Sequence, residues 1–348
     1  YDVLLDDYEP EMKTAEVAAI FTALKQDLVP LIAAIRARQD TVSDAPLHGR
    51  FPRAEQEAFC LSLLGQLGFT REAWRLDPTV HPFASNSATQ DIRITTRYYE
   101  DFINPALFGS MHEFGHGLYE HQISPALERT PLCRGTSLGL HESQSRMWEN
   151  LVGRSRPFWQ FMYPRLQAAF PAQFADVPLE AFYRAINKVQ PSFIRVEADE
   201  ATYSLHIILR FEMEQALIAG EIPLRDVPAA WNARFKSYFG VDVPDDAQGV
   251  LQDVHWSGGM IGYFPTYALG SIIACQIWEK ILADLPDLPA QVGRGEVAPL
   301  REWLRTRLHQ HGRKFTPAET LRRVVGGPIA VQPFIRYLTA KYGEIYGL

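Results

Sequence analysis

Cysteine is scarce in this 348-residue chain, which contains Cys60, Cys133 and Cys275. The odd count and the long spacings do not suit a disulfide framework, so we expect free thiols and a reducing, cytoplasmic location. The sequence also lacks a recognisable signal peptide, an initiator methionine, an internal repeat and a low-complexity linker. With 47% hydrophobic and 22% charged residues, it is expected to fold as a single globular domain over residues 1–348.

A basic excess is missing as well. The net charge is −7, and Lys and Arg are scattered along the chain instead of clustered. We therefore expect neither a nucleic-acid partner nor a membrane partner.

Residues 254–278 contain no Asp, Glu, Lys or Arg, but their glycines, Pro265 and polar side chains make the stretch too broken to span lipid. It is expected to form a buried loop that leads into a core helix.

Most of the chain has apolar residues at steps of three and four, which is typical of α-helices. Thr14, near the start of one of these segments, and Asn104, just before another, are suitable N-caps. The pattern predicts a mainly α-helical protein. The predicted helices cover residues 12–38, 50–67, 105–122, 137–152, 205–218, 229–239, 267–285, 300–311, 317–325 and 335–342.

Residues 91–98 alternate instead, with polar side chains such as Arg93 on one side and apolar ones such as Ile92 and Ile94 on the other. Such alternation predicts a half-buried β-strand, and hence a small sheet beside the helix that follows. An edge strand in this sheet could pair with an extended peptide backbone. A structural hairpin without a binding role explains the same pattern equally well.

The segment from Met111 to Tyr119 contains a His-Glu-x-x-His motif. On a helix, His112 and His116 are one turn apart on one face and can bind a single zinc ion. Glu113 lies beside them and can accept a proton from a zinc-activated water. With ten histidines in the chain, a chance match is the weaker alternative. Three glycines lower the helix propensity here, and we expect them where another backbone or a substrate comes close. They are Gly109, Gly115 and Gly117.

A zinc site of this kind needs a third protein ligand. His121 is too close to the motif on the same helix to reach the metal. Glu142 is favoured, because many zinc peptidases take the third ligand from a Glu on a second helix. His141 projects about 100° away from Glu142 around the helix, which suits contact with the substrate or with a metal ligand. The candidates after the motif are His121, His141, Glu142 and Glu149.

The chain contains six short motifs, spread over about two thirds of its length. They are His81-Pro82-Phe83, Asp91-x-Arg93-x-Thr95, His112-Glu113-Phe114-Gly115-His116, His141-Glu142-Ser143-Gln144, Ile194-Arg195-x-x-Ala198-Asp199 and Gly249-x-x-Gln252-Asp253-x-His255-Trp256. Together, and in this order, they resemble the motifs of the Taq-type thermostable carboxypeptidase family of zinc metallopeptidases.

The resemblance implies a zincin-like helical fold with a deep active-site groove and a small β-sheet beside the zinc helix. It also implies Zn²⁺ held by His112, His116 and Glu142, with Co²⁺ as a possible substitute. The expected activity is the release of single residues from peptides with a free C-terminus, by a homodimer. Family members usually carry a further hundred or more residues before the position of Tyr1, so the groove is expected to lack one wall.

A carboxypeptidase must recognise the terminal carboxylate, and the planar fork of an arginine suits this task. Arg195 is the candidate from the motif resemblance. The alternative is a salt bridge from Arg195 to a nearby acid, and the nearby acids are Glu197, Asp199 and Glu200. Gln252 is expected to close the same end of the groove. Further predicted substrate contacts are Arg93, His81 and His141.

The reaction also needs hydrogen-bond donors to the oxyanion that develops on the scissile carbonyl. Candidates are His255, Tyr263 and Tyr267, with His255 and Tyr267 favoured; each tyrosine could instead be a core aromatic.

Two other functions remain as alternatives. One is an oligopeptidase or dipeptidyl carboxypeptidase on the same scaffold. The other is a non-catalytic, zinc-stabilised binding protein, against which the presence of Glu113 argues, because a structural site needs no base.

Overall fold

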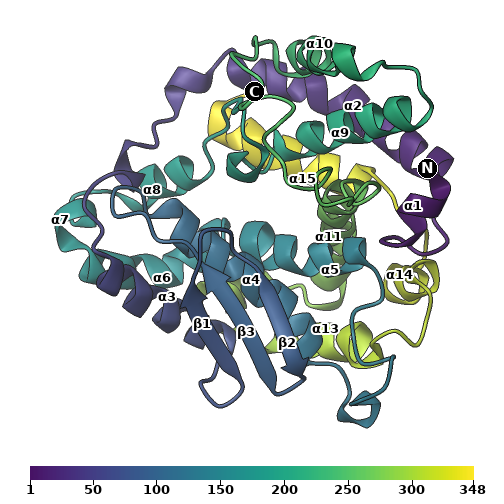
Figure 1. The fold of residues 1–348 in the computed structure, drawn as a ribbon. Helices are drawn as coiled ribbons and strands as arrows, with labels where there is room; N and C mark the ends of the chain where they lie inside the picture. Colours follow the sequence, from purple (N-terminus) through teal and green to yellow (C-terminus); the bar gives the residue numbers. More distant parts are fainter.

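A computed structural model describes all 348 residues and contains helices with one three-stranded sheet (Figure 1). In chain order the α-helices are α1 (Asp2–Asp6), α2 (Thr14–Arg36), α3 (Arg53–Leu67), α4 (Asn104–His121), α5 (Leu138–Arg146), α6 (Arg156–Ala169), α7 (Pro171–Phe174), α8 (Leu179–Ile186), α9 (Tyr203–Ile218), α10 (Val227–Phe239), α11 (Pro265–Asp284), α12 (Leu288–Gly293), α13 (Ala298–Arg307), α14 (Pro317–Val325) and α15 (Gln332–Tyr346). A π-helical turn, η4 (Met147–Val152), continues α5. Short 3-10 helices occupy Gln39–Thr41, Ala45–Leu47, Pro125–Leu127, Arg195–Glu197, Leu224–Asp226 and His309–His311.

All ten predicted helices are present, which confirms the mainly α-helical class, although their ends differ by several residues. Both predicted caps are wrong. Lys13 is the N-cap of α2, and the N-cap of α4 is Ile103, which offers no side-chain acceptor. Five helices were not predicted, namely α1, α6, α7, α8 and α12. Pro164 lies inside α6 and Pro171 follows it at the start of α7, so prolines interrupt the pattern there.

The loop before α11 differs from the prediction of a buried loop. His255 and Phe264 are buried, but Val254 is 71% exposed, and Ser257, Gly258 and Gly259 are exposed as well. The core helix expected after this loop is correct, because α11 buries most of its residues.

Helix α2 is long and apolar enough to cross a membrane, by length and composition alone. It buries one stripe of apolar side chains in the core, as core helices of soluble proteins also do.

The sheet consists of β1 (Trp74–Pro78), β2 (Ala84–Ala88) and β3 (Asp91–Thr96) in the order β1-β3-β2. Strand β3 pairs in parallel with β1 and antiparallel with β2. The predicted strand is therefore the central one, with no free edge to offer a peptide; the edges belong to β1 and β2. As predicted, Ile92 and Ile94 are buried while Arg93 is exposed.

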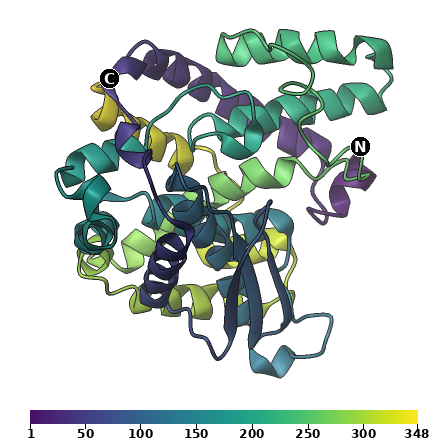
Figure 2. The same ribbon diagram turned by 60° about the vertical axis from the view of Figure 1, so that its left-hand side comes forward.

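Helices α2, α9 and α10 lie together at one end of the molecule, and the sheet lies at the opposite end in both views (Figures 1 and 2). Helix α4 packs on the sheet at Gly117, where a Cβ atom would come 2.4 Å from the ring of Trp74 and 2.7 Å from Ile92. A Cβ atom at Gly109 would lie 3.3 Å from the side chain of Thr96. These two glycines therefore meet side chains of the sheet region rather than a backbone.

Helix α5 lies between α4 and α11, and glycines bring the three helices close together. At Gly115 of α4, a Cβ atom would lie 2.5 Å from the carbonyl oxygen of Gln144 and 2.6 Å from Cα of Ser145. This confirms the expectation that another backbone approaches Gly115. At Gly270 of α11, a Cβ atom would lie 2.5 Å from Cγ of Glu142. Glycine at both positions lets the motif helix, α5 and α11 approach more closely than larger residues would permit.

The first nine residues hold the N-terminal end of α5. The carbonyl of Tyr8 accepts a hydrogen bond from the Leu138 amide at 3.1 Å. The buried Glu9 carboxylate accepts one from the Gly139 amide. A carboxylate at a helix N-terminus pairs with free N–H groups and with the positive end of the helix dipole. Burial nevertheless raises the pKa of Glu9 to about 7. The beginning of the chain thus fixes where α5 starts.

Substitution of Gly115 by alanine tests the close packing of α4 on α5. The added methyl group overlaps the α5 backbone, so we expect the free energy of unfolding to fall by about 1–3 kcal/mol. Urea unfolding followed by circular dichroism measures this change. The matched control is Gly343→Ala in α15, where a Cβ atom meets nothing within 4 Å; it should gain about 0.5–1 kcal/mol. Equal stability of the two variants would contradict this packing.

Candidate metal centre

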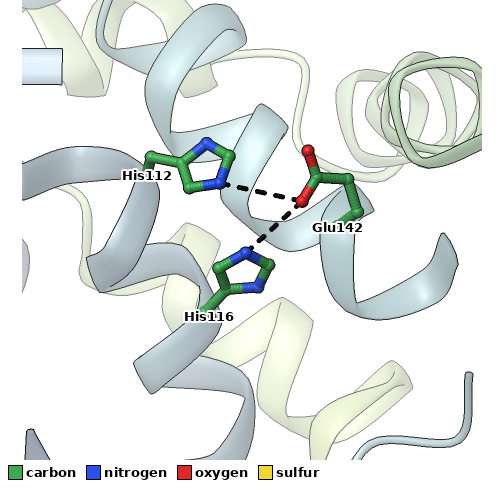
Figure 3. Close-up of side chains that lie close together, drawn as sticks. All are labelled: His112, His116 and Glu142. Carbon is green, nitrogen blue, oxygen red and sulfur yellow. Dashed lines mark ion pairs between the residues drawn. The ribbon is translucent and has the colours of Figure 1, made fainter. Parts of the chain in front are cut away.

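Three side chains converge between α4 and α5 (Figure 3). His112 and His116 project from one face of α4, because four residues make about one helical turn. Glu142 comes from α5 and offers Oε2 to both, 3.7 Å from Nε2 of His112 and 3.4 Å from Nε2 of His116. One donor atom of each residue lies within 4.8 Å of those of the other two. The structure thus brings the three predicted metal ligands together.

These residues fit a divalent cation. Two imidazole nitrogens and a carboxylate oxygen are a typical donor set for zinc in catalytic sites, which keep a fourth position for water or substrate. Glu113, next to His112, is 5% exposed, and its Oε2 atom has no hydrogen-bond partner. Burial raises the pKa of Glu113 to about 7, while His112 opposes that rise. An unpaired buried carboxyl group is costly unless it serves a purpose, and a proton acceptor beside the cation is such a purpose.

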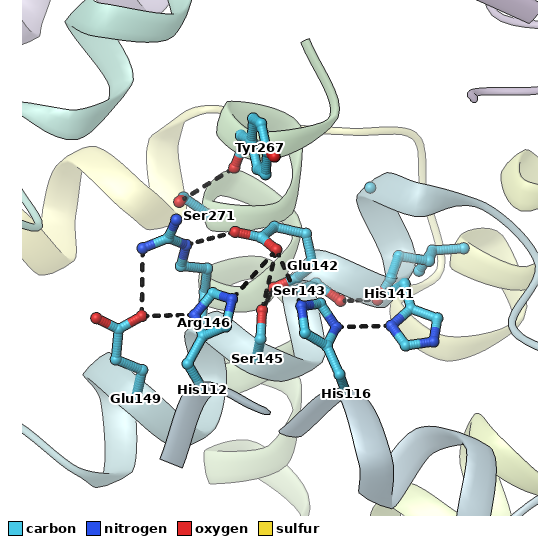
Figure 4. Close-up of polar contacts among 12 residues, drawn as sticks. His112, His116, His141, Glu142, Ser143, Ser145, Arg146, Glu149, Tyr267 and Ser271 are labelled. Atoms are coloured by element: carbon cyan, nitrogen blue, oxygen red, sulfur yellow. Dashed lines mark hydrogen bonds and ion pairs between the residues drawn. The ribbon is translucent and has the colours of Figure 1, made fainter. Parts of the chain in front are cut away.

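A charged network holds Glu142 and His112 in place (Figure 4). Arg146 donates from Nε to Glu142 at 2.7 Å and from Nη1 to Glu149 at 3.2 Å. Glu149 also lies 2.8 Å from Nδ1 of His112. Burial works against ionisation of Glu142, but Arg146 and the two histidines bring its pKa well below the ordinary range. Glu149, a candidate ligand from the sequence, thus orients His112 and does not join the ligand set.

His116 has a different support, which consists of a second imidazole and then a carboxylate. Its Nδ1 atom lies 2.7 Å from Nδ1 of His141, and Nε2 of His141 lies 2.9 Å from Oε1 of Glu120. With Nε2 of His116 facing Glu142, Nδ1–H of His116 donates to His141, and His141 in turn donates to Glu120. His141 therefore contacts a metal ligand, which is one of its two expected roles. Glu120, which also accepts a hydrogen bond from the Gly135 amide, was not predicted, because no local pattern marks it.

The three candidate donors to the oxyanion lie together. Tyr267 is one turn before Gly270 on α11, so the contact of Gly270 with Glu142 brings Tyr267 to the same region. Its hydroxyl is 3.1 Å from Nε2 of His255, and its ring centroid is 5.2 Å from that of Tyr263. Burial raises the pKa of Tyr263 to about 12 and holds the pKa of Tyr267 well above its ordinary value. Both phenols therefore stay protonated and can donate hydrogen bonds.

Arg195 is buried and forms a salt bridge, but its partner is not Glu197, Asp199 or Glu200. Its Nε donates to Asp253 at 2.9 Å, and its Nη1 donates to the Tyr203 hydroxyl at 3.0 Å. Asp253 also binds Arg210 at 2.6 Å. Nη2 of Arg195 makes no hydrogen bond, and it is not completely buried. Arg210 was the missed residue here, although a charge within the apolar run 205–211 was an available signal.

Gln252 braces this region instead of offering a free amide. Its Oε1 accepts from the Arg195 backbone N–H at 2.7 Å, and its Nε2 donates to the carbonyl of Phe193 at 2.9 Å. Burial, and then the positive charge of Arg195, lower the pKa of His81. The structure does not bring Arg93 to the cluster, because Arg93 lies on the exposed face of the sheet and pairs with Asp91. His121, rejected as a ligand, donates to the carbonyl of Thr89.

Comparison with known proteins gives one consistent result. The family model described as Carboxypeptidase Taq (M32) metallopeptidase matches residues 1–342. Thermostable carboxypeptidase 1 of Thermus thermophilus is 47% identical over 100% of this chain and 68% of its own length. Carboxypeptidase 1 of Bacillus subtilis is 43% identical over 99% of this chain and 69% of its own.

Solved structures agree with the sequence relatives. The M32 carboxypeptidase of Deinococcus radiodurans R1 has a TM-score of 0.97 and 40% identity, over 100% of this chain and 70% of that one. The Pyrococcus furiosus carboxypeptidase has a TM-score of 0.95 and 38% identity, over 98% of this chain and 69% of that one. The family suggested by the six motifs is thereby confirmed, and this chain belongs to the Carboxypeptidase Taq (M32) family of metallopeptidases.

Proposed function

We propose that this chain removes single amino acids from the C-termini of peptides, with Zn²⁺ as its metal and Glu113 as its general base. Membership of the family makes it a metallocarboxypeptidase; the metal, the base and the single-residue product are the proposal. The observation that carries it is the convergence of His112, His116 and Glu142 beside a buried Glu113 with an unpaired oxygen. The unpaired base favours catalysis over a zinc-stabilised binding protein.

Zn²⁺ held by the two histidines and Glu142, or Co²⁺ in its place, would act as a Lewis acid on the scissile carbonyl and lower the pKa of a water molecule. Glu113 accepts the proton of the attacking water, and the oxygen of that water forms a bond with the carbonyl carbon. As the C–N bond breaks, Glu113 delivers the proton to the departing amine. Tyr267, supported by His255, donates to the carbonyl oxygen as it gains negative charge.

The terminal carboxylate of the substrate is proposed to bind Arg195. Two of the three guanidinium nitrogens are held by Asp253 and Tyr203, so the third has a fixed direction and no partner. A pre-oriented, poorly hydrated guanidinium suits a carboxylate. Recognition of the terminal carboxylate distinguishes a carboxypeptidase from an oligopeptidase. If the bound carboxylate lies one residue from the cleaved bond, the product is a single amino acid, whereas a dipeptidyl carboxypeptidase releases two residues. Gln252 serves this site by holding the backbone of Arg195, and His81 is retained as a candidate contact.

We also propose that the protein works in the cytoplasm as a homodimer. Support for the location comes from the thiols, since Cys60, Cys133 and Cys275 are all unpaired and free thiols are typical of reducing compartments. Support for the dimer comes from the family resemblance alone. Sedimentation of the purified chain measures its oligomeric state directly, and a monomer at micromolar concentration would contradict this part of the proposal.

Replacement of Glu113 by glutamine removes the base with little change in shape. We expect kcat for a blocked dipeptide with a free C-terminus to fall by about 10²–10⁴-fold. Zinc content, measured by atomic absorption, should stay at the wild-type level, because Glu113 is not a ligand. Glu319→Gln on α14, where Glu319 is half-exposed and paired with Arg323, is the control and should leave kcat unchanged. Activity that survives in Glu113→Gln would overturn the assigned mechanism.

Arg195→Ala tests recognition of the carboxylate. Loss of a hydrogen bond to a charged group costs about 1.5–3 kcal/mol, so KM for the same dipeptide should rise about tenfold or more while zinc content stays constant. The comparison variant is Arg93→Ala on the outer face of the sheet, for which we expect no change in KM. A rise in KM for Arg93→Ala, or an unchanged KM for Arg195→Ala, would contradict these assignments.

His141→Ala tests the support of His116. Loss of a hydrogen-bond partner to a ligating histidine typically weakens metal binding by about 10–100-fold. Titration of Zn²⁺ against a competing chelator measures the Kd of the protein for the metal. His121→Ala, five residues beyond His116 on α4 and paired with a backbone carbonyl, is the control and should keep the wild-type Kd. Equal Kd values for wild type and His141→Ala would exclude a role of His141 in metal binding.

A further inference from the structure

A second polar cavity lies at the C-terminal end of α4, where α13 packs against it. Its volume is about 280 Å³, close to the lower limit of small-molecule sites, which is about 300 Å³. Its walls are Leu118 and residues 121–125 at the end of α4 and after it, and Arg301, Arg305 and Gln310 in and after α13. None of the nine lining residues carries a carboxylate. The charged side chains of this cavity are therefore all basic.

Arg301 is unusual among the half-buried charged residues because it has no partner. Its guanidinium makes no hydrogen bond or salt bridge, and Nε is buried without an acceptor. The group lies against Gly68 at the end of α3, where a Cβ atom would overlap it. Burial alone shifts the pKa of Arg301 downward, with no acidic residue to oppose it. A partly desolvated cation without a counter-charge is costly, so an external anion would lower the free energy of this state.

Arg305 places a second positive charge on the same cavity. It follows Arg301 by four residues on α13, and side chains at this spacing share one helix face. Glu302 binds two of the guanidinium nitrogens of Arg305, Nε at 2.8 Å and Nη2 at 2.6 Å, which leaves Nη1 free. Two like charges four residues apart repel each other. An anion between them would remove this repulsion.

Most neutral polar groups of the cavity are already engaged. Gln122 donates its amide to the carbonyl of Arg301 at 3.2 Å, and Gln310 donates its amide to that of Thr306 at 2.7 Å. Nδ1–H of His121 donates to the carbonyl of Thr89 at 2.7 Å. Ser124 accepts a hydrogen bond from the Ala126 amide and donates none, so its hydroxyl and the two arginines keep free donors for a ligand.

We propose that this cavity binds a small oxyanion with two negative charges, of the phosphate type, between Arg301 and Arg305. Guanidinium groups bind phosphate through paired N–H donors, so one anion can be held from two sides. The site is separate from the metal centre, because its α4 residues follow His116 at the far end of the helix. The proposal does not depend on peptidase activity.

The test is a calorimetric titration of the zinc-loaded protein with inorganic phosphate at constant ionic strength. We expect one phosphate per chain with a Kd of about 1 mM or tighter. Sulfate should bind in the same range, whereas acetate and chloride should bind at least tenfold more weakly. No binding of phosphate by wild type below 10 mM would overturn the proposal.

Arg301→Gln should weaken phosphate binding at least tenfold. The control is Arg323→Gln on α14, whose arginine is exposed and paired with Glu319, and it should keep the wild-type Kd. Phosphate that still binds Arg301→Gln with the wild-type Kd must occupy the metal centre or another surface, which would overturn the proposal. Arg301→Lys retains the charge without the paired donors. Its Kd should lie between those of wild type and Arg301→Gln, and it replaces the glutamine variant if that variant does not fold.

Discussion

The close approach of three helices is the constraint on which the metal centre depends. Helix α5 lies between α4 and α11, and at both contacts one partner is a glycine, Gly115 on one side and Gly270 on the other. A side chain at either position would separate the helices, because packed interiors leave no room for an added carbon. Glu142 would then move away from His112 and His116. The spacing within α4 sets where the histidines are, but the glycines set how far away the carboxylate is.

The same close approach concentrates charge in a place with little water. Glu113, Glu142, Glu149 and Arg146 are all largely buried around the two histidines. Arg146 contacts both Glu142 and Glu149, and Arg154 lies 3.7 Å from Glu149, so three carboxylates face two arginines. The carboxylates still outnumber the arginines, and a divalent cation would add positive charge beside Glu142, so this arrangement suits a metal. The partner of each histidine then determines its orientation: a carboxylate for His112, and an imidazole followed by a carboxylate for His116.

Local pattern decided which features could be predicted from the sequence. The helices with regular apolar spacing, the His-Glu-x-x-His motif and Glu142 depend on neighbours along the chain or on short motifs. The strand at residues 91–96 was also visible, but its central place in the sheet depends on β1 and β2, whose sequences carry little alternation. The salt bridge of Arg195 with Asp253 joins residues 58 positions apart, so the nearest acids in the sequence were poor candidates. Glu120 supports His141 across α4 and α5, and only the packing of these helices reveals it.

The proposed recognition side of the site is built on a different principle from the candidate metal side. Arg195 begins a single 3-10 turn, and Gln252 and His255 lie in a loop, so no α-helical spacing fixes their positions. Asp253 holds these segments to α9, because its two oxygens bind Arg195 and Arg210, and Gln252 ties the two loops through backbone groups. Breaking a buried pair of this kind leaves a charge without its partner and is strongly unfavourable. A single carboxylate therefore gives irregular loops the fixed geometry that helix packing gives to the ligands, and it keeps one nitrogen of Arg195 directed and free.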